Sequence, residues 1–195
     1  MKKTIALILT LTMLTALLAG CTGITVVIGE CTCPTEPDRY VPAEGALKTG
    51  LSVSVNIADS ASATAEAKGA AKYDITLAAV TVDDNGVIVS CVIDSVPATV
   101  EFDAKGNIIT DLTAAVQTKN ELGENYGMKA WGGAKAEWNE QAAAFAAYVT
   151  GKTAEEVAGI AITETTKPAD GTDLASSVTI SIGGFQALIA KALSK

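Results

Sequence analysis

The chain has 195 residues, with 22 acidic side chains against 14 basic ones and a formal net charge of −8. It contains no histidine. This excludes Ser-His-Asp and Cys-His nucleophilic systems and metal sites built on paired histidines. An acidic surface repels nucleic acid, so we expect no nucleic-acid partner. No pair of carboxylates is singled out by its spacing, so we do not expect a conventional hydrolase.

The first twenty residues have the pattern of a secretory signal peptide. Lys2 and Lys3 precede an apolar run, Thr4–Leu18, that is shorter than the ~20 apolar residues a spanning helix needs. The junction Leu18-Ala-Gly-Cys21 resembles the lipobox of bacterial lipoproteins. The resemblance implies that Cys21 is lipidated after cleavage and anchors the chain at the extracytoplasmic face of the cell membrane. The alternative is an ordinary signal peptide in which Cys21 has no role.

Residues 21–48 contain three of the five prolines, and we interpret them as a tether between the lipid and a folded domain. The apolar run Ile24–Ile28 fits either a strand or a segment near the membrane. If Cys21 is lipidated, Cys31, Cys33 and Cys91 remain, an odd number that cannot form a full set of disulfides. Cys31-Thr-Cys33 fits a strained disulfide, half a metal site or a solvated tether. Without histidine or a second cysteine pair we favour the tether and predict no metal.

Residues 49–195 are predicted to form a single α+β domain that begins with strands. Apolar and polar residues alternate from Leu51 to Ala58, which predicts a strand with one wet face. Two runs rich in β-branched residues, 73–82 and 87–96, flank Asp83-Asp-Asn-Gly86, a strong hairpin signal. The acidic tip lacks the spacing of a calcium loop, so the hairpin interpretation is favoured. A similar turn pattern in Phe102–Ile108 extends the prediction to an antiparallel meander.

Helices are predicted in the C-terminal part. Trp138, Ala142, Phe145 and Val149 fall on one apolar stripe at helical spacing. A capping-box pattern at Thr153-x-x-Glu predicts a short helix through residue 157, and an amphipathic pattern predicts a last helix from 185 to 193. Strands followed by helices predict an antiparallel meander with the C-terminal helices packed on one face.

The stretch Asp173-Leu-Ala-Ser-Ser-Val-Thr-Ile-Ser-Ile-Gly-Gly184 carries four hydroxyl side chains just before the last helix. It resembles the modification motif of the FMN-binding domain family, in which a transferase attaches FMN to a threonine through a phosphoester. The resemblance implies that Asp173 matches the family aspartate, Ser176 the first hydroxyl residue and Thr179 the flavin-bearing threonine. Ser181 falls one place past the family's second hydroxyl.

Two residues of this stretch depart from the family pattern. Ser177 stands where the family has glycine, and Val178 where it has alanine. Gly183 and Gly184 permit close backbone approach, and a phosphoester beside a helix N-terminus meets free N–H groups and the positive end of the helix dipole. We therefore include Ser177 and Gly183 in the expected cofactor site.

A glycine-rich stretch, 118–133, carries Tyr126, Met128 and Trp131, a composition suited to sandwiching a flat ring. The alternative is that its aromatic residues cover the edge of the sheet. Lys119 and Lys129 in the same stretch are candidates to meet a phosphate, although isolated lysines are usually solvated.

The sequence thus predicts a lipid-anchored extracytoplasmic protein that binds FMN and passes electrons, with a flavin transferase and a redox partner. The alternative is a non-enzymatic surface lipoprotein that binds a ligand or a protein and has lost the flavin. Ser177 and Val178 favour the alternative, whereas the spacing from Asp173 to Thr179 favours the flavin.

Overall fold

The computed structural model describes residues 45–194; the predicted signal peptide, Cys21, Cys31 and Cys33 lie outside them. The described chain begins with three strands, β1 (Lys48–Asn56), β2 (Gly69–Val82) and β3 (Ile88–Phe102). They form one antiparallel sheet in the order β1-β2-β3. The predicted meander is therefore confirmed, with strands longer than the sequence pattern indicated.

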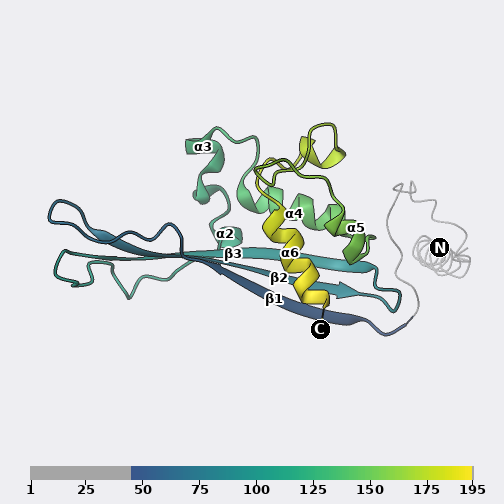
Figure 1. Cartoon of the computed structure of the whole chain (residues 1–195), viewed down its shortest axis with the longest axis horizontal. Coiled ribbons are helices and arrows are strands. Elements are labelled where there is room, and N and C mark those ends of the chain that lie inside the picture. Colours follow the sequence, from purple (N-terminus) through teal and green to yellow (C-terminus); the bar gives the residue numbers. More distant parts are fainter. Residues whose placement is uncertain (1–44, 195) are drawn as a thin grey trace, which may run out of the picture. The chain divides into compact units, whose positions relative to one another are not determined.

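The helices follow the strands in the chain and lie on one side of the sheet (Figure 1). Helix α4 packs on β3, and α6 packs on β1 and β2. This confirms the α+β class, and α4, α5 and α6 begin and end close to the predicted helices. The stretch predicted as a glycine-rich loop folds instead into three short helical turns. In chain order the helical elements are α2 (Lys119–Leu122), η1 (Gly123–Tyr126), α3 (Met128–Gly132), α4 (Trp138–Val149), α5 (Ala154–Ala158), η2 (Asp173–Ser176) and α6 (Gly183–Leu193).

Two acidic turns of the same design end β2 and β3. Asp83 is buried, and its Oδ1 accepts hydrogen bonds from the backbone N–H groups of Asn85 and Val87 at 2.9 and 3.0 Å. In the second turn Asp103 Oδ1 accepts hydrogen bonds from the backbone N–H groups of Lys105 and Asn107. Hydrogen bonds from Asn107 lower the pKa of the Asp103 carboxyl group. The hairpin interpretation of the first turn is confirmed. After the second turn the chain makes only an isolated bridge to β3 and no further strand within the described residues.

The two faces of β1 are used in a way that the alternating pattern did not suggest. The apolar residues were expected to face the core, yet Leu51 is 61% exposed and Val55 58% exposed. Ser52, on the opposite face, is only 3% exposed and lies under α6. The strand was predicted correctly, but its polar face points toward the helices and its apolar face points away from them.

Close packing of α6 explains this inversion. A Cβ atom on Gly50 would lie 2.0 Å from the carbonyl oxygen of Ala192, so the helix backbone rests directly on the glycine. One turn earlier in α6, the Ser52 hydroxyl donates a hydrogen bond of 2.7 Å to the Leu188 carbonyl oxygen. Only small side chains allow a helix to approach a sheet this closely, and Ser52 also satisfies its own polar group.

The hydrophobic core lies between the sheet and the helices α4, α5 and α6. Its centre is aromatic: the Phe185 ring packs edge-on to Trp138 at 5.9 Å and against Phe145 at 5.5 Å between centroids. The apolar stripe predicted for α4 is confirmed, because all four of its residues are buried. β2 and β3 supply the floor of the core with Ala78, Val80, Val82, Ile88 and Ile93.

Strands β2 and β3 extend beyond the end of β1 as a two-stranded arm, in which residues 69–73 pair with 98–102 (Figure 1). Pro97 lies at the base of this arm, opposite Asp74. Proline removes a donor from the hydrogen-bond ladder and is tolerated where a strand has an open edge. β3 offers such an edge, because no described strand pairs with its outer side.

The contact between Gly50 and α6 gives a direct test of the packing. We expect Gly50→Ala to destabilise the fold by about 1–3 kcal/mol, because the new methyl group overlaps the backbone of α6. Denaturant unfolding followed by tryptophan fluorescence measures the change. Gly132→Ala is the matched control: no atom lies within 4 Å of its Cβ position, so its stability is expected to stay unchanged or rise slightly.

Candidate functional site

A cleft of about 460 Å³ opens between the inner face of the sheet and the N-terminal half of α6. We call it the α6 cleft. One part of its lining is apolar and contains the rings of Trp138 and Phe185. The rest is polar and includes one acidic and one basic side chain. The residues that line the cleft are Ser54, Val55, Asn56, Asp74, Thr76, Lys119, Trp138, Ile180, Ser181, Gly184, Phe185 and Leu188.

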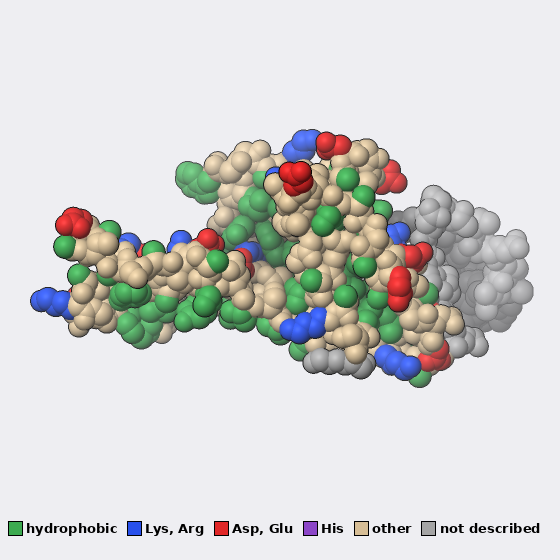
Figure 2. All heavy atoms as spheres, in the orientation of Figure 1, with side chains coloured by type: hydrophobic (Ala, Val, Ile, Leu, Met, Phe, Trp, Pro, Cys, Tyr) green, Lys and Arg blue, Asp and Glu red, His purple; other side chains and the backbone are tan. Residues whose placement is uncertain are grey.

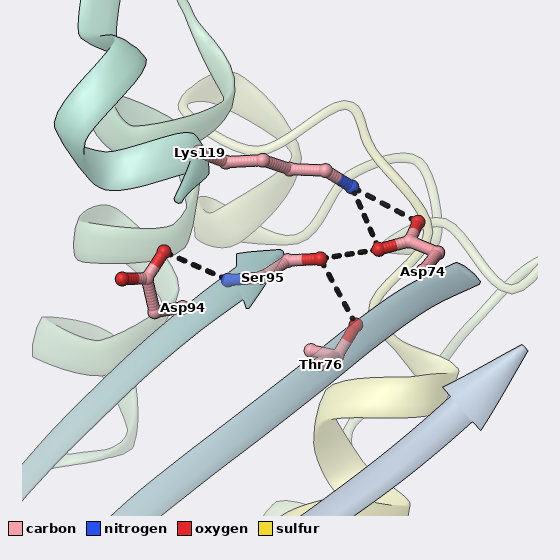
Figure 3. A network of polar contacts seen from close by, with 5 residues as sticks. All are labelled: Asp74, Thr76, Asp94, Ser95 and Lys119. Carbon is pink, nitrogen blue, oxygen red and sulfur yellow. Dashed lines mark hydrogen bonds and ion pairs between the residues drawn. The ribbon is translucent and has the colours of Figure 1, made fainter. Parts of the chain in front are cut away.

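The two charged residues of the α6 cleft form an ion pair (Figure 3). Lys119 is only 6% exposed, and its Nζ donates to both carboxylate oxygens of Asp74 at 3.0 and 3.2 Å. The ammonium also lies over the rings of Tyr126 and Trp138, 5.4 and 5.1 Å from their centroids. Taking an ammonium out of water is costly unless it is paired, and these contacts compensate the loss. A positive charge is thereby held at the wall of the cleft.

The carboxylate of Asp74 is shared with a second partner. The Ser95 hydroxyl also donates to Asp74 Oδ1, and Thr76 lies within 3.4 Å of the Ser95 hydroxyl (Figure 3). Both serine and threonine stand on the inner face of the sheet beside Asp74. The side chain of Asp74 remains 45% exposed. Its carboxylate is therefore oriented by protein donors while it keeps room for a further hydrogen-bond donor.

The position of Lys119 follows from the start of α2. Thr118 caps this helix, and its backbone N–H donates to the Glu121 carboxylate at 2.8 Å, which completes a capping box. Asn120 ties the helix to the edge of β3: its side-chain amide donates to the Ile93 carbonyl oxygen at 3.0 Å, and its backbone N–H donates to Asp94 at 3.1 Å. Lys119 is thus the first residue of an anchored turn and points inward.

The predicted attachment residue, Thr179, lies beside the cleft and is held by a buried glutamine. Gln141 of α4 is 1% exposed, and its Oε1 accepts from the Thr179 N–H at 2.7 Å, the Thr179 hydroxyl at 3.1 Å and the Ile180 N–H at 3.2 Å. Its amide nitrogen donates to the Ala136 carbonyl oxygen. The next two residues after Thr179 line the cleft, so Gln141 places the exposed threonine at its rim.

The two departures from the family motif have clear structural positions. Val178 is 1% exposed and belongs to the core, while Thr179 beside it is exposed. The valine side chain therefore does not cover the threonine hydroxyl. Ser177 is exposed, and its hydroxyl donates to the Leu174 carbonyl oxygen at 3.3 Å. Both residues serve the turn that precedes Thr179.

The other predicted residues of this stretch are divided between the turn and the cleft. Asp173 and Ser176 belong to η2, where the Ser176 hydroxyl donates to the Asp173 carbonyl oxygen at 2.8 Å, and neither lines the α6 cleft. Ser181 does line it. Gly183 packs against Thr166, since a Cβ on the glycine would lie 2.9 Å from that of the threonine. The glycine that faces the cleft is Gly184, which has no atom within 4 Å of its Cβ position.

Thr166 holds the start of α6 in place. It has a φ of 59°, a left-handed conformation that is rare for a β-branched residue. Its carbonyl oxygen accepts from the N–H groups of Ile182 at 2.8 Å and Gly183 at 3.3 Å, and its hydroxyl bonds that of Ser181. A strained residue therefore fixes the stretch that leads from Thr179 into the helix.

The three residues expected to sandwich a ring are not brought together around one cavity. Tyr126 lies beside Lys119 and lines a smaller pocket of about 150 Å³ next to the α6 cleft. Met128 is partly buried against the core, and its N–H donates to Glu137 at 2.8 Å. Trp131 is 89% exposed and packs against Gly127. Lys129 is also exposed, 3.9 Å from the nearest oxygen of Glu140.

Sequence reasoning missed most of the residues that form the cleft. Trp138 and Phe185 were recognised only as parts of apolar stripes, which they are; both are buried, and the small part of each that lines the cleft could not be foreseen. Asp74 and Thr76 carry no motif. The one sequence signal for the cleft was the alternation of polar and apolar residues in β1. Ser54 and Asn56, which line the cleft, lie on the same face of the strand as the buried Ser52.

A second cleft, of about 500 Å³, follows the open edge of β3 beside α4 and is lined by Cys91, Asn139 and the alanines of α4. Burial raises the pKa of the Cys91 thiol from 9.0 to about 11. A thiol that stays protonated is a poor nucleophile. Cys91 therefore acts as a small, partly buried apolar residue of β3.

Known proteins do not extend this description, because the chain matches no protein-family model, no curated protein and no solved structure. Within residues 45–194, no helix is long and apolar enough to cross a bilayer. The same residues contain no group of three or more cysteine, aspartate or glutamate side chains that could hold a metal ion.

Replacing Gln141 tests how the rim of the cleft is held. We expect Gln141→Ala to cost about 2–4 kcal/mol of stability, because two backbone N–H groups and a hydroxyl lose their common acceptor. Denaturant unfolding measures this. Gln117→Ala, at an exposed position, is the control and is expected to change stability by less than about 0.5 kcal/mol. Equal stability of the two variants would contradict the role given to Gln141.

The raised pKa of Cys91 predicts slow alkylation. At pH 8 we expect the thiol to react about a hundredfold more slowly in the folded chain than in urea, because its thiolate fraction is that much smaller. Mass spectrometry of the peptide that contains Cys91 measures the rate. The folded pKa lies above the unfolded one, so the related stability is complete below pH 9 and is lost as the pH rises toward 11. In Cys91→Ala this part of the alkaline loss is expected to disappear.

Proposed function

We propose that the chain binds FMN in the α6 cleft, attached through a phosphoester at Thr179, and that it carries electrons outside the cytoplasm. The observation that carries the proposal is the position of residues 179–184. Thr179 is exposed and does not itself line the cleft, but the next two residues, Ile180 and Ser181, do, and so does Gly184. Of the residues that carry the sequence resemblance, Ser181 lines the cleft and Thr179 directly precedes its lining, whereas Asp173 and Ser176 belong to the turn before it.

The residues of the cleft fit the chemistry of a flavin nucleotide. Its volume, about 460 Å³, is within the range of small-molecule sites. Trp138 and Phe185 offer apolar surface to a flat ring, and Ser54, Asn56 and Thr76 offer hydrogen bonds to its polar edge. The N-terminus of α6, an eleven-residue helix, begins at Gly183 and favours a phosphate there.

The chain's own residues prepare the attachment. Gln141 orients the Thr179 segment, and Val178 is buried away from the hydroxyl. In the transfer, a bond forms between Thr179 Oγ and the flavin-side phosphorus of a flavin dinucleotide. The phosphoanhydride bond breaks, a nucleoside monophosphate leaves, and the hydroxyl proton passes to the transferase. Once bound, FMN supplies the one- and two-electron chemistry, while the protein binds and shields it.

The site of this chemistry follows from the N-terminal sequence. The lipobox-like junction at Cys21 supports attachment of the chain to the extracytoplasmic face of the cell membrane through a lipid. A flavin transferase and a redox partner outside the cytoplasm are the proteins that this function requires.

A second candidate function is supported by the Lys119–Asp74 pair. These charges already satisfy each other, and the Thr179 hydroxyl already donates to Gln141. The same cleft therefore suits a lipoprotein that binds a polar ligand or a protein without carrying flavin. Ser177, which stands where the related family has glycine, also favours this alternative.

In-gel flavin fluorescence of the full chain tests the proposal. When the chain is produced with a flavin transferase, we expect a fluorescent band that survives denaturation and a mass increase of one FMN. Thr179→Ala is expected to lose more than nine-tenths of the fluorescence, whereas Thr165→Ala, at an exposed threonine of a nearby loop, keeps it.

Two other outcomes would redirect the interpretation. Fluorescence that persists in Thr179→Ala would place the attachment elsewhere and overturn the role of this residue. A dark wild-type band together with no binding of free FMN would overturn the flavin proposal and leave the non-flavin binding protein.

A further inference from the structure

The outer face of the sheet, opposite the helices, is a continuous apolar surface. Cross-strand partners share a face, so the register places β1 residues beside those of β2 and β3: Leu51 beside Ala79 and Val92, and Val55 beside Ile75 and Val96. No described residue range covers this face, and Val92 is 53% exposed. We call it the outer sheet face: Leu51, Val53, Val55, Ile75, Leu77, Ala79, Val92 and Val96.

Exposed apolar surface of this kind requires an explanation. Soluble monomers rarely show contiguous apolar patches larger than a few hundred Å². β1 alone presents Leu51 and Val55 at about 60% exposure each, whereas Ser52 between them is buried. Figure 2 shows further hydrophobic side chains gathered along the lower side of the arm. The apolar row of β1 therefore lies on the side of the sheet that the helices leave open.

The charge of this face restricts what can cover it. The chain carries a net charge of −8, yet the outer sheet face contains a single charged position, Asp94, opposite Leu77. That carboxylate lies on β3, the edge strand, and accepts from the N–H groups of Ser95 and Asn120. No lysine or arginine stands among the face residues, so nothing there would attract anionic lipid headgroups.

We propose that the outer sheet face binds the same face of a second copy of this chain. Two faces that are apolar except for Asp94 at the edge strand can pack as aligned sheets about 10 Å apart, as in a β-sandwich. Two acidic chains repel each other over most of their surfaces, but each brings only this one carboxylate, which is already bonded to two N–H groups, to the contact. A two-fold axis through the contact makes each face its own partner.

The size of the face is sufficient for such a contact. Three strands at spacings of about 4.8 Å, over seven residues of about 3.4 Å each, give a flat area of roughly 14 by 24 Å. Side chains increase the accessible area, so that two copies together bury on the order of 1,000 Å², the lower limit for a specific interface. The dimer is therefore expected to be reversible rather than obligate.

The α6 cleft is on the opposite side of the same sheet and shares only Val55, at the edge strand β1, with the outer sheet face, so this dimer leaves both clefts open. The proposal is accordingly independent of what the cleft binds. In this proposal the inner face of the three-stranded sheet, under the helices, binds a ligand, and the outer face binds a second copy of the chain.

Site-specific photo-crosslinking in intact cells tests the proposal on the full chain. With benzoylphenylalanine in place of Val53, we expect a band at twice the mass of the chain and peptides that link position 53 to the strands of a second copy. The control position is Ala187, which is exposed on α6, and there we expect at least tenfold less of this band. A link from position 53 to residues 1–44 of the same chain, to lipid or to another protein, or no link at all, would overturn the proposal.

A charge on the face gives a second, separate readout. Two differently tagged copies of the wild-type chain are expected to be recovered together. We expect Val53→Glu to lower this recovery at least tenfold, because two carboxylates would meet in the contact, whereas Ala187→Glu leaves it unchanged. Circular dichroism identifies any loss of fold in Val53→Glu. Recovery unaffected in a folded Val53→Glu chain would contradict a dimer through this face.

Discussion

The rest of the structure depends on how closely α6 lies on β1. At its C-terminal end the helix backbone rests on Gly50, and one turn earlier the Ser52 hydroxyl bonds a helix carbonyl. Further along the strand the inner row continues with Ser54 and Asn56, where the helix no longer lies directly on the sheet and the cleft opens. The same contact that buries Ser52 leaves the apolar row of β1 outside.

The inner face of the sheet therefore changes character along its length. Near the turn between β2 and β3 it carries Val80 and Ile88 and belongs to the core. Toward the arm it carries Thr76, Ser95 and Asp74, which form a hydrogen-bonded group completed by Lys119. Such a group costs desolvation free energy and adds little net stability.

The strained residue Thr166, the hydrogen bonds of Gln141 and the residues of the sequence resemblance all lie close to the start of α6. Thr166 in a left-handed conformation and the buried Gln141 both hold the segment 179–183 from its two sides. Their shared effect is to fix one wall of the cleft, which is the preorganisation that a binding site requires. In the proposed dimer the two walls would face away from each other, because each lies on the helix side of its sheet.

The sequence by itself determined the strands, the hairpin turns and the helices α4, α5 and α6, because these depend on local periodicity and on capping and turn residues. Asp83 and Asp103 bind their own turns, and the stripe from Trp138 to Val149 needs only one apolar partner. It also placed Thr179 and Ser181 near the start of a helix. Which face of β1 is buried was decided only in the tertiary structure, because alternation gives two faces without saying which one a helix will cover. The ion pair of Lys119 and Asp74 and the bonds of Gln141 to Thr179 join residues 45 and 38 positions apart, and no local pattern contains that information.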